Sequence, residues 1–224
     1  MTQAHPTLAI IGGTGDLGSG LAKRWAEAGY PVIIGSRDKA RAEDAARQFA
    51  GNGKATVRGD SNLGAAQAGD IVVITVPWGN HDATLEEIKA AVAGKIVIDA
   101  AVPLVPPKVA TVQLPPDGSA AQTAQRILGS EVKVVSAFQN VGAAKLQAGG
   151  PVDCDVLVCG NDKAAREVVM ALADAAGTRG IDAGVLANSA AADALTSLLI
   201  GINRRYKADH AGIRITGLPA PDAA

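Results

Sequence analysis

The stretch AIIGGTGDLGSGLAKRW, residues 9–25, sets an apolar run, a glycine-rich turn and a helical pattern one directly after another. Gly13, Gly15 and Gly18 stand in a G-x-G-x-x-G register between the predicted strand and the predicted helix. In this motif the first glycine permits a tight turn, the second lets backbone approach a pyrophosphate, and the third allows close packing of helix on strand. Free N–H groups at the helix start then face the phosphates. The stretch therefore predicts a dinucleotide-binding turn that opens an α/β fold.

The residues that follow repeat the alternation of apolar strands and helical segments, which predicts a parallel sheet with right-handed crossovers. We expect a Rossmann-type doubly wound α/β sheet over residues 1–135 and a smaller α/β C-terminal part over residues 136–224 for the second substrate and dimerisation. Prolines between residues 103 and 118 predict an ordered surface loop. The expected strands are residues 7–13, 31–35, 55–59, 70–78, 95–103, 133–138, 154–160 and 180–184, and the expected helices are 16–28, 38–50, 81–93, 119–129, 140–148, 162–176 and 188–206.

The second strand runs into VIIGSRDKAR, residues 32–41, and its ending bears on which nucleotide is bound. A carboxylate at this place would accept hydrogen bonds from the 2′-hydroxyl of the adenosine ribose. Ser36 and Arg37 stand there instead, and a hydroxyl and a guanidinium can both donate to a 2′-phosphate. Arg41 lies one helical turn further on and could add a second cation. The strand ending therefore predicts NADP(H) in preference to NAD(H).

Composition and charge exclude several classes of partner. The 224 residues are 48% hydrophobic, with 21 Lys and Arg against 22 Asp and Glu, and no basic run stands out. Nucleic acid and membrane are therefore not expected as partners. The N-terminal MTQAHP lacks the basic and long apolar regions of a signal peptide, and no run reaches about 18 apolar residues. A cytoplasmic protein is expected.

Few side chains offer acid, base or metal chemistry. His5, His81 and His210 are scattered without metal-ligand spacing, and each is expected at the surface or at a helix end, so no metal site is predicted. Cys154 and Cys159 lie five positions apart on a predicted strand and are expected to be two inert thiols in a reducing compartment. No residue is selected as a certain catalytic acid or base.

Five segments together resemble one known family. IGGTGDLGSGLA, IIGSR, ITVPW, VVSAF and DAGVLANS, in this order and spacing, are similar to the NADPH-dependent reductases of the 8-hydroxy-5-deazaflavin coenzyme F420. The resemblance implies an oxidoreductase that transfers a hydride between NADP(H) and coenzyme F420 or a related flavin. The cofactor-binding residues expected from the motif and the resemblance together are Gly13, Thr14, Gly15, Asp16, Leu17, Gly18, Ser36, Arg37, Arg41, Val76, Pro77, Trp78, Asn80, Val102 and Ala143.

The segment SAFQNVGAAKL, residues 136–146, departs from that family, which tends to carry a histidine at the position of Gln139. Gln139 and Asn140 can hydrogen-bond the carbonyl edge of a tricyclic ring, and with Val141 they are the expected residues that bind the acceptor. The alternative is that the two amides cap the helix that follows, because Asn is a strong N-cap residue.

Three functions remain open from the sequence. Direct hydride transfer asks the protein only to hold two rings in contact in a dry cleft, which suits the scarcity of acids and bases. Ketone reduction would require a proton donor. An NADPH-dependent flavin or ferric reductase would keep every cofactor residue and change only the opposite ring, and a non-catalytic NADP(H)-sensing module would bind the nucleotide without turnover.

The long segment ANSAAADALTSLLIGINRRY, residues 187–206, carries Leu195, Leu198, Leu199 and Ile202 at helical spacing. It is more apolar than a lone surface helix needs to be. A homodimer interface on this helix is expected, and an ordinary helix of the intramolecular core is the alternative.

Overall fold

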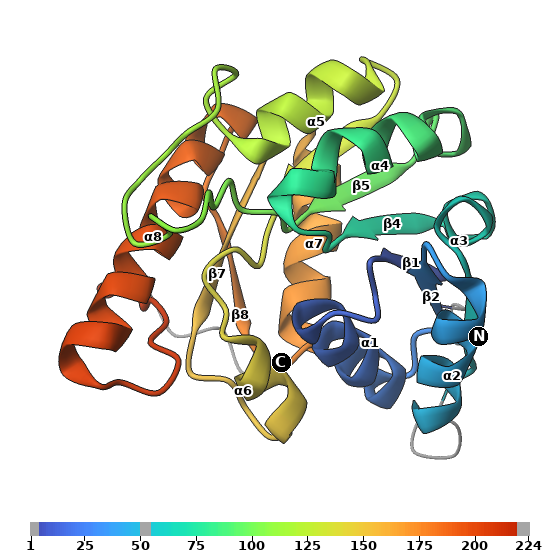
Figure 1. Ribbon diagram of the computed structural model, residues 1–224, viewed down its shortest axis with the longest axis horizontal. Coiled ribbons are helices and arrows are strands. Elements are labelled where there is room, and N and C mark those ends of the chain that lie inside the picture. Colours follow the sequence, from blue (N-terminus) through green and yellow to red (C-terminus); the bar gives the residue numbers. More distant parts are fainter. Residues whose placement is uncertain (1–4, 50–54, 219–224) are drawn as a thin grey trace.

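The computed structural model describes residues 5–49 and 55–218, in which the strands join into one eight-stranded sheet (Figure 1). The strand order is β3-β2-β1-β4-β5-β6-β7-β8, and its first six members follow the order of the doubly wound dinucleotide-binding fold. Neighbouring strands are parallel except β6 and β7, which are antiparallel. The strands are β1 Leu8–Ile11, β2 Val32–Ser36, β3 Val57–Ser61, β4 Ile71–Ile74, β5 Ile96–Asp99, β6 Lys133–Ser136, β7 Asp155–Gly160 and β8 Arg179–Asp182.

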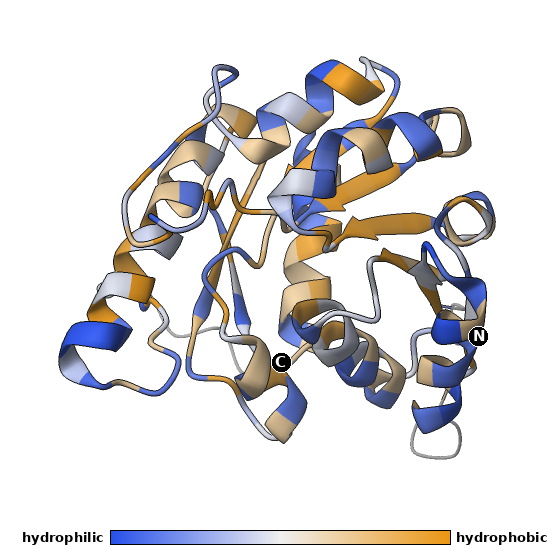
Figure 2. Cartoon of the chain, in the orientation of Figure 1, coloured by the Kyte–Doolittle hydropathy of each residue, from blue (hydrophilic) through white to orange (hydrophobic). Residues whose placement is uncertain are grey.

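Helices cover both faces of the sheet. Side chains of α1, α2, α6 and α7 pack with one face and those of α3, α4 and α5 with the other, while α8 packs against α5. In Figure 2, β4 and β5 are largely hydrophobic in colour, whereas the helices around them alternate between hydrophilic and hydrophobic residues. The helices are α1 Asp16–Ala28, α2 Lys39–Phe49, α3 Asn62–Ala68, α4 His81–Ile88, α5 Ala120–Leu128, α6 Ala143–Ala148, α7 Lys163–Ala175 and α8 Ser189–Tyr206, with short 3-10 turns η1 Trp78–Asn80, η2 Lys89–Ala91 and η3 Leu186–Asn188.

Strand β1 illustrates why these strands are apolar at every position. Leu8 and Ile10 belong to the core on the α1 side, and Ala9 and Ile11 belong to the core on the α3 side, so both faces are buried. A strand that is covered on both faces gains from apolar side chains throughout its length. On the α1 side, Trp25 is fully buried and anchors the core.

Most predicted elements are present, and the differences have local causes. Helix α3 was not predicted, because NLGAAQA is short and contains a glycine; it begins where the Ser61 hydroxyl accepts a hydrogen bond from the Gly64 N–H at 3.0 Å. The helix predicted from residue 140 begins at Ala143, after Phe138 turns the chain with a φ of +75°. The loop at residues 103–118 contains neither helix nor strand, as its prolines predicted.

The sheet continues through the predicted domain boundary at residue 135. Strand β6 spans that boundary and pairs with β5 on one side and β7 on the other. The division into residues 1–135 and 136–224 therefore remains a prediction about function rather than a break in the sheet.

Candidate cofactor-binding cleft

The turn after β1 is made by a glycine one position earlier than the motif predicts. Gly12 has a φ of +79°, in the left-handed region that strains any residue with a Cβ. Gly13 has no such dihedral, but a Cβ there would lie 2.8 Å from the carbonyl oxygen of Ile10. The expectation that Gly13 makes the tight turn is therefore corrected: Gly12 makes it, and Gly13 permits close packing.

The start of α1 is open to an anion. Gly15 is its N-cap residue and provides no side-chain cap, so the first N–H groups of the helix lack a partner within the helix. These groups and the positive end of the helix dipole favour a phosphate. A Cβ at Gly18 would lie 2.6 Å from Thr75 Oγ1, so this glycine permits the close packing that the motif predicts.

A cleft of about 450 Å³ lies at this turn. Its walls are the turn after β1, the end of β2, the first turns of α2 and α3, and the segment after β4. The predicted site residues that line it are Thr14, Gly15, Asp16, Ser36, Arg37, Arg41, Val76, Pro77 and Asn80. It also includes Gly12, Asn62, Thr75 and Thr84, which the sequence did not single out.

One end of the cleft carries a hydroxyl and two cations. Ser36 closes β2, and its Oγ accepts a hydrogen bond from the Asp38 N–H at 3.2 Å. The side chains of Arg37 and Arg41 are exposed, and within residues 5–49 and 55–218 neither guanidinium is paired with a carboxylate. Both cations therefore remain available to a bound anion.

Asn62 is a candidate site residue that the sequence analysis missed. It begins α3, directly after β3, and only 2% of its surface is exposed. Its Oδ1 is buried without a hydrogen-bond partner in the described part of the chain, and lies 3.2 Å from where a Cβ at Gly35 would be. Because an amide oxygen only accepts hydrogen bonds, Asn62 offers an acceptor to a donor group of a bound nucleotide. No residue pattern pointed to Asn62, because the segment that forms α3 was not predicted to be a helix.

The remaining predicted residues lie outside the lining of this cleft. Trp78 turns toward His81, with ring centroids 4.9 Å apart and 33° between the ring planes. Val102 follows β5, and Ala143 begins α6. Their predicted contacts with the nicotinamide remain predictions. The full set outside the lining is Gly13, Leu17, Gly18, Trp78, Val102, Gln139, Asn140, Val141 and Ala143.

Gln139 ties the loop after β6 to the end of β5. Its Nε2 donates to the Asp99 carbonyl oxygen at 2.8 Å and to Ser136 Oγ at 2.9 Å, whereas its Oε1 is buried and has no partner among the described residues. Both amide hydrogens are thus in use, so Gln139 can accept a further hydrogen bond but cannot donate one. In this geometry Gln139 has no spare hydrogen for a carbonyl edge, so that expected contact is corrected for this residue.

Asn140 ties the same loop to α8. Its Nδ2 donates to the Ala192 carbonyl oxygen at 2.8 Å and to Thr196 Oγ1 at 3.1 Å. Both amide hydrogens are in use, so the expected donation to a carbonyl edge is corrected for Asn140 as well. Helix α6 has Gly142 as its N-cap residue and no side-chain cap, so the alternative that these two amides cap the helix is wrong. Val141 is buried in the core beside them.

Three titratable side chains are buried close to these loops. His81 and Asp99 are both fully buried, with Nε2 and Oδ2 2.8 Å apart, and His81 is the first residue of α4, so it meets the expectation of a surface or helix-end position by the second alternative. Asp193 of α8 accepts a hydrogen bond from the Ala120 N–H at 2.8 Å, and its Oδ1 has no described partner. Burial raises the pKa of Asp193 to about 7, and the negative charge of Asp99 acts in the same direction.

Other chemistry receives no support within the described residues. Cys154 and Cys159 are free and buried, and burial raises both thiol pKa values, that of Cys159 to about 11, so both stay protonated as inert thiols. Across residues 5–49 and 55–218, no group of three or more His, Cys, Asp or Glu side chains is arranged to hold a metal ion. In the same ranges, none of the helices has the length and apolar character needed to cross a membrane.

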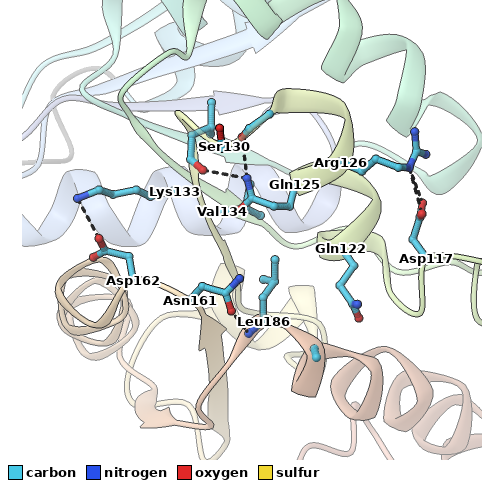
Figure 3. Close-up of a pocket in the computed structure, with 13 residues that line it drawn as sticks. Asp117, Gln122, Gln125, Arg126, Ser130, Lys133, Val134, Asn161, Asp162 and Leu186 are labelled. Atoms are coloured by element: carbon cyan, nitrogen blue, oxygen red, sulfur yellow. Dashed lines mark hydrogen bonds and ion pairs between the residues drawn. The ribbon is translucent and has the colours of Figure 1, made fainter.

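A second cleft, of about 980 Å³, lies at the amino end of β6 (Figure 3). Figure 3 shows that its charged side chains are paired with one another: Lys133 with Asp162 at 3.1 Å, and Arg126 with Asp117 at 3.0 Å. Ligands of open parallel sheets bind at the carboxyl ends of the strands, whereas this cleft lies at their amino ends. Although it is larger, this cleft is not the candidate nucleotide site.

Known proteins resemble the chain along almost its whole length. Residues 7–103 match the family described as NADP oxidoreductase coenzyme F420-dependent. An F420-dependent NADP reductase of Methanocaldococcus jannaschii is 46% identical over 94% of this chain and 98% of its own length. One of Methanothermobacter thermautotrophicus is 43% identical over 95% of each protein.

A solved structure agrees with these relatives. A candidate F420-dependent NADP-reductase from Arthrobacter sp. FB24 superposes with a TM-score of 0.77 and 26% identity, over 93% of this chain and 98% of that one. The chain belongs to the family of F420-dependent NADP reductases.

Proposed function

We propose that this protein is an oxidoreductase that transfers a hydride between NADP(H) and coenzyme F420. Its relatives at 42–46% identity, aligned over most of the chain, carry the name F420-dependent NADP reductase. The observation in this chain that carries the proposal is the cleft in which Ser36, Arg37 and Arg41 lie at one end and the open start of α1 lies beside them. A nucleotide with a pyrophosphate and a 2′-phosphate matches both features.

The residues of the cleft fit the adenosine half of NADP(H). The first turn of α1 would hold the pyrophosphate with backbone N–H groups, and Thr14 lines the cleft in the loop just before the helix. Arg37 and Arg41 would hold the 2′-phosphate with charge-assisted hydrogen bonds, and Ser36 would add a hydroxyl. The unpartnered Asn62 oxygen would accept from a ribose hydroxyl or from the adenine amino group, because a phosphate dianion has no hydrogen to give it.

The nicotinamide end is proposed for the segments that follow β4, β5 and β6, where Val76, Pro77, Trp78, Asn80, Val102 and Ala143 lie. We propose that the hydride acceptor binds beside Gln139, Asn140 and Val141, also at the carboxyl ends of the strands. NADPH, when bound, supplies a hydride from its nicotinamide ring to the deazaflavin. The protein contributes orientation and the exclusion of water, and no side chain is assigned a proton to transfer.

The proposal is tested by turnover with purified protein. NADPH is offered with F420, FMN, FAD and ferric chelates in parallel, and the reverse reaction is run with reduced F420 and NADP⁺. We expect turnover with F420 in both directions and rates with the other acceptors at least about tenfold lower. Faster turnover with FMN, FAD or ferric chelates would show that F420 is not the preferred acceptor. NADPH binding without turnover of any acceptor would indicate a sensing module.

We also propose that the protein is a homodimer that uses α8. Leu198 is 51% exposed, Ile202 is 39% exposed and Tyr206 is 72% exposed, all on this helix, whereas Leu199 faces inward. The loop at residues 103–118 lies beside the helix (Figure 1) and adds exposed apolar side chains of its own. Apolar surface of this kind is typical of subunit contacts.

The dimer is tested by sedimentation at micromolar concentration. Leu198→Glu should produce a monomer, and Val168→Glu, at an apolar residue of α7 that is 37% exposed, is the matched control that should leave the dimer intact. A wild-type monomer would contradict the dimer. We further propose a cytoplasmic location, supported by the two free thiols.

A further inference from the structure

His81 begins α4, and both of its ring nitrogens face carboxylates. Nε2 lies 2.8 Å from Asp99 Oδ2, and Nδ1 lies 3.1 Å from Asp82 Oδ1. A neutral imidazole carries one N–H group, so it can donate to only one of these two acceptors. The imidazolium carries two N–H groups and donates to both. The geometry therefore favours the positively charged ring.

The surroundings stabilise this charge although the ring is buried. Burial lowers the pKa of His81, but the hydrogen bonds and charges of Asp99 and Asp82 raise it by more, so the pKa lies above its ordinary value. Asp99 is fully buried with the ring, whereas the side chain of Asp82 is 62% exposed and its charge is screened by solvent. Asp193 of α8 is the further buried acid coupled to this pair: the charge of Asp99 raises the pKa of Asp193 and the charge of His81 lowers it.

Asp99 extends the contact to two further segments of the site. Its Oδ1 accepts a hydrogen bond from the Ala101 N–H at 2.9 Å, in the segment after β5. Its backbone oxygen accepts from Gln139 Nε2 at 2.8 Å, in the loop after β6. On the other side of the histidine, the Trp78 ring packs against the imidazole in the segment after β4. One buried ring thus joins the three segments that are proposed to surround the nicotinamide.

We propose that His81 is a positioning residue for hydride transfer: as an imidazolium held by Asp99, it fixes the segments after β4, β5 and β6 relative to one another. The ring has no exposed surface, so it touches no substrate and acts through Asp99 and Trp78. Without the ring charge, the fully buried Asp99 carboxylate would lose its cationic partner and keep only the hydrogen bond from the Ala101 N–H. The segments would then lose their fixed spacing, while the adenosine end of the cleft would be untouched. This inference rests on the proposed function.

The charge state of His81 is tested without any turnover. The chain has three histidines, so nitrogen-15 magnetic resonance of the imidazole nitrogens can follow all of them, and His81→Asn assigns one signal set. We expect both His81 nitrogens to carry protons near neutral pH and the ring to titrate above the ordinary histidine value of about 6.5. A singly protonated His81 ring below that value would overturn the proposal.

The positioning role is tested by the pH dependence of turnover with NADPH and F420. Since the folded pKa of His81 is raised, turnover should hold at lower pH and fall as the pH rises through that pKa. Asp99→Asn removes the buried partner and should move this fall to lower pH by about one to three pH units. Asp82→Asn removes the exposed partner, and this matched control should move it by less than about half a pH unit.

The binding and turnover constants separate positioning from folding. His81→Asn should lower kcat by about tenfold at low pH and abolish the decrease of turnover with rising pH. The Kd for NADPH should change by less than about threefold, because the adenosine contacts remain. If turnover decreased over the same pH range in His81→Asn, Asp99→Asn and the wild type, the proposal would be overturned. If the wild type shows no F420 turnover at all, the proposed function fails, and the resonance experiment still decides the charge of His81.

Discussion

The guanidinium of Arg24 in α1 donates from Nε to the carbonyl oxygen of Leu146 in α6 at 2.7 Å. Its other nitrogens donate to the carbonyl oxygens of Gly150 at 2.5 Å and Lys145 at 3.0 Å. A buried arginine of the first βαβ unit therefore occupies the C-terminal end of a helix that lies beyond residue 135 in the chain. Carbonyl groups at a helix end carry partial negative charge, which suits a cation that has no carboxylate partner among the described residues.

Arg24→Met should destabilise the protein by about 2 to 4 kcal/mol, because it removes three hydrogen bonds from a charged donor, one of them buried and two partly buried. The free energy of unfolding in urea measures this. Lys23→Met is the matched control: the Lys23 ammonium also donates to α6, at the Gln147 carbonyl oxygen, but at the surface. It should cost less than about 1 kcal/mol. Equal losses in the two variants would show that burial of Arg24 is not what matters.

The Arg24 contact also shows what the sequence could and could not indicate. The positions of the strands along the chain and the start of α1 follow from apolar runs and a glycine register, which are local signals. The hydrogen bonds between Arg24 and the end of α6 join residues more than 120 positions apart. From the sequence, an arginine inside an amphipathic helix is predicted to be at the surface until its partner is known. The same is true of His81, whose partner Asp99 ends a different strand.

Within the site, the residues proposed to hold the 2′-phosphate were easier to predict than those proposed to face the acceptor. Arg37 and Arg41 follow a strand in a fixed order, and the structure brings both into the cleft. The role of Gln139 depends on which of its amide atoms already form hydrogen bonds. The role of Asn62 depends on its Oδ1, which has no hydrogen-bond partner among the described residues. Neither property is visible in a residue pattern.

Arg37→Ala should weaken NADPH binding by about tenfold to a hundredfold, the effect of a lost charge-assisted phosphate contact worth about 1.5 to 3 kcal/mol. NADH binding should change little. Ser36→Asp, which places a carboxylate beside the 2′-phosphate, should shift the preference toward NADH. Fluorescence titration of both nucleotides measures the effects. Arg47→Ala, at an exposed arginine of α2 paired with Asp44, is the control and should leave both affinities unchanged. An unchanged NADPH/NADH ratio in both site variants would refute the assignment.

Asn62→Ala should weaken NADPH and NADH alike, by about threefold to tenfold, because a neutral hydrogen bond contributes about 0.5 to 1.5 kcal/mol and the proposed donor is present in both nucleotides. Asn62→Asp should weaken NADPH more than NADH, since it adds a negative charge near the 2′-phosphate site. Titration with the two nucleotides distinguishes this pattern from that of Arg37. If Asn62→Ala affected NADPH alone, its oxygen would not be facing a shared group.

Asp193→Asn should change how stability depends on pH. The folded pKa of about 7 lies above the ordinary value of about 3.9, so the stabilisation from the neutral acid is fully present below about pH 4 and is lost as the pH rises toward 7. Asparagine stays neutral and keeps an oxygen for the Ala120 N–H. The Tm of the variant relative to wild type should therefore rise across that range. Asp209→Asn, at a side chain that is 84% exposed, is the control, and a constant Tm difference for Asp193→Asn would contradict the assignment.

Gln139→Ala should lower turnover with F420 by about tenfold, the order expected for one or two lost hydrogen bonds, while the Kd for NADPH changes by less than about threefold. The variant removes both the donor to the Asp99 carbonyl oxygen and the unpartnered Oε1. Gln139→Glu separates these two parts, because a carboxylate keeps acceptor oxygens but has no hydrogen for Asp99. If the hydrogen bond to the Asp99 carbonyl oxygen of β5 is what matters, both variants should show lower turnover and a lower Tm. If Oε1 accepts from the acceptor ring, Gln139→Glu should keep a lower KM for F420 than Gln139→Ala does. A fall in NADPH affinity with unchanged F420 kinetics would place Gln139 on the nucleotide side of the cleft instead.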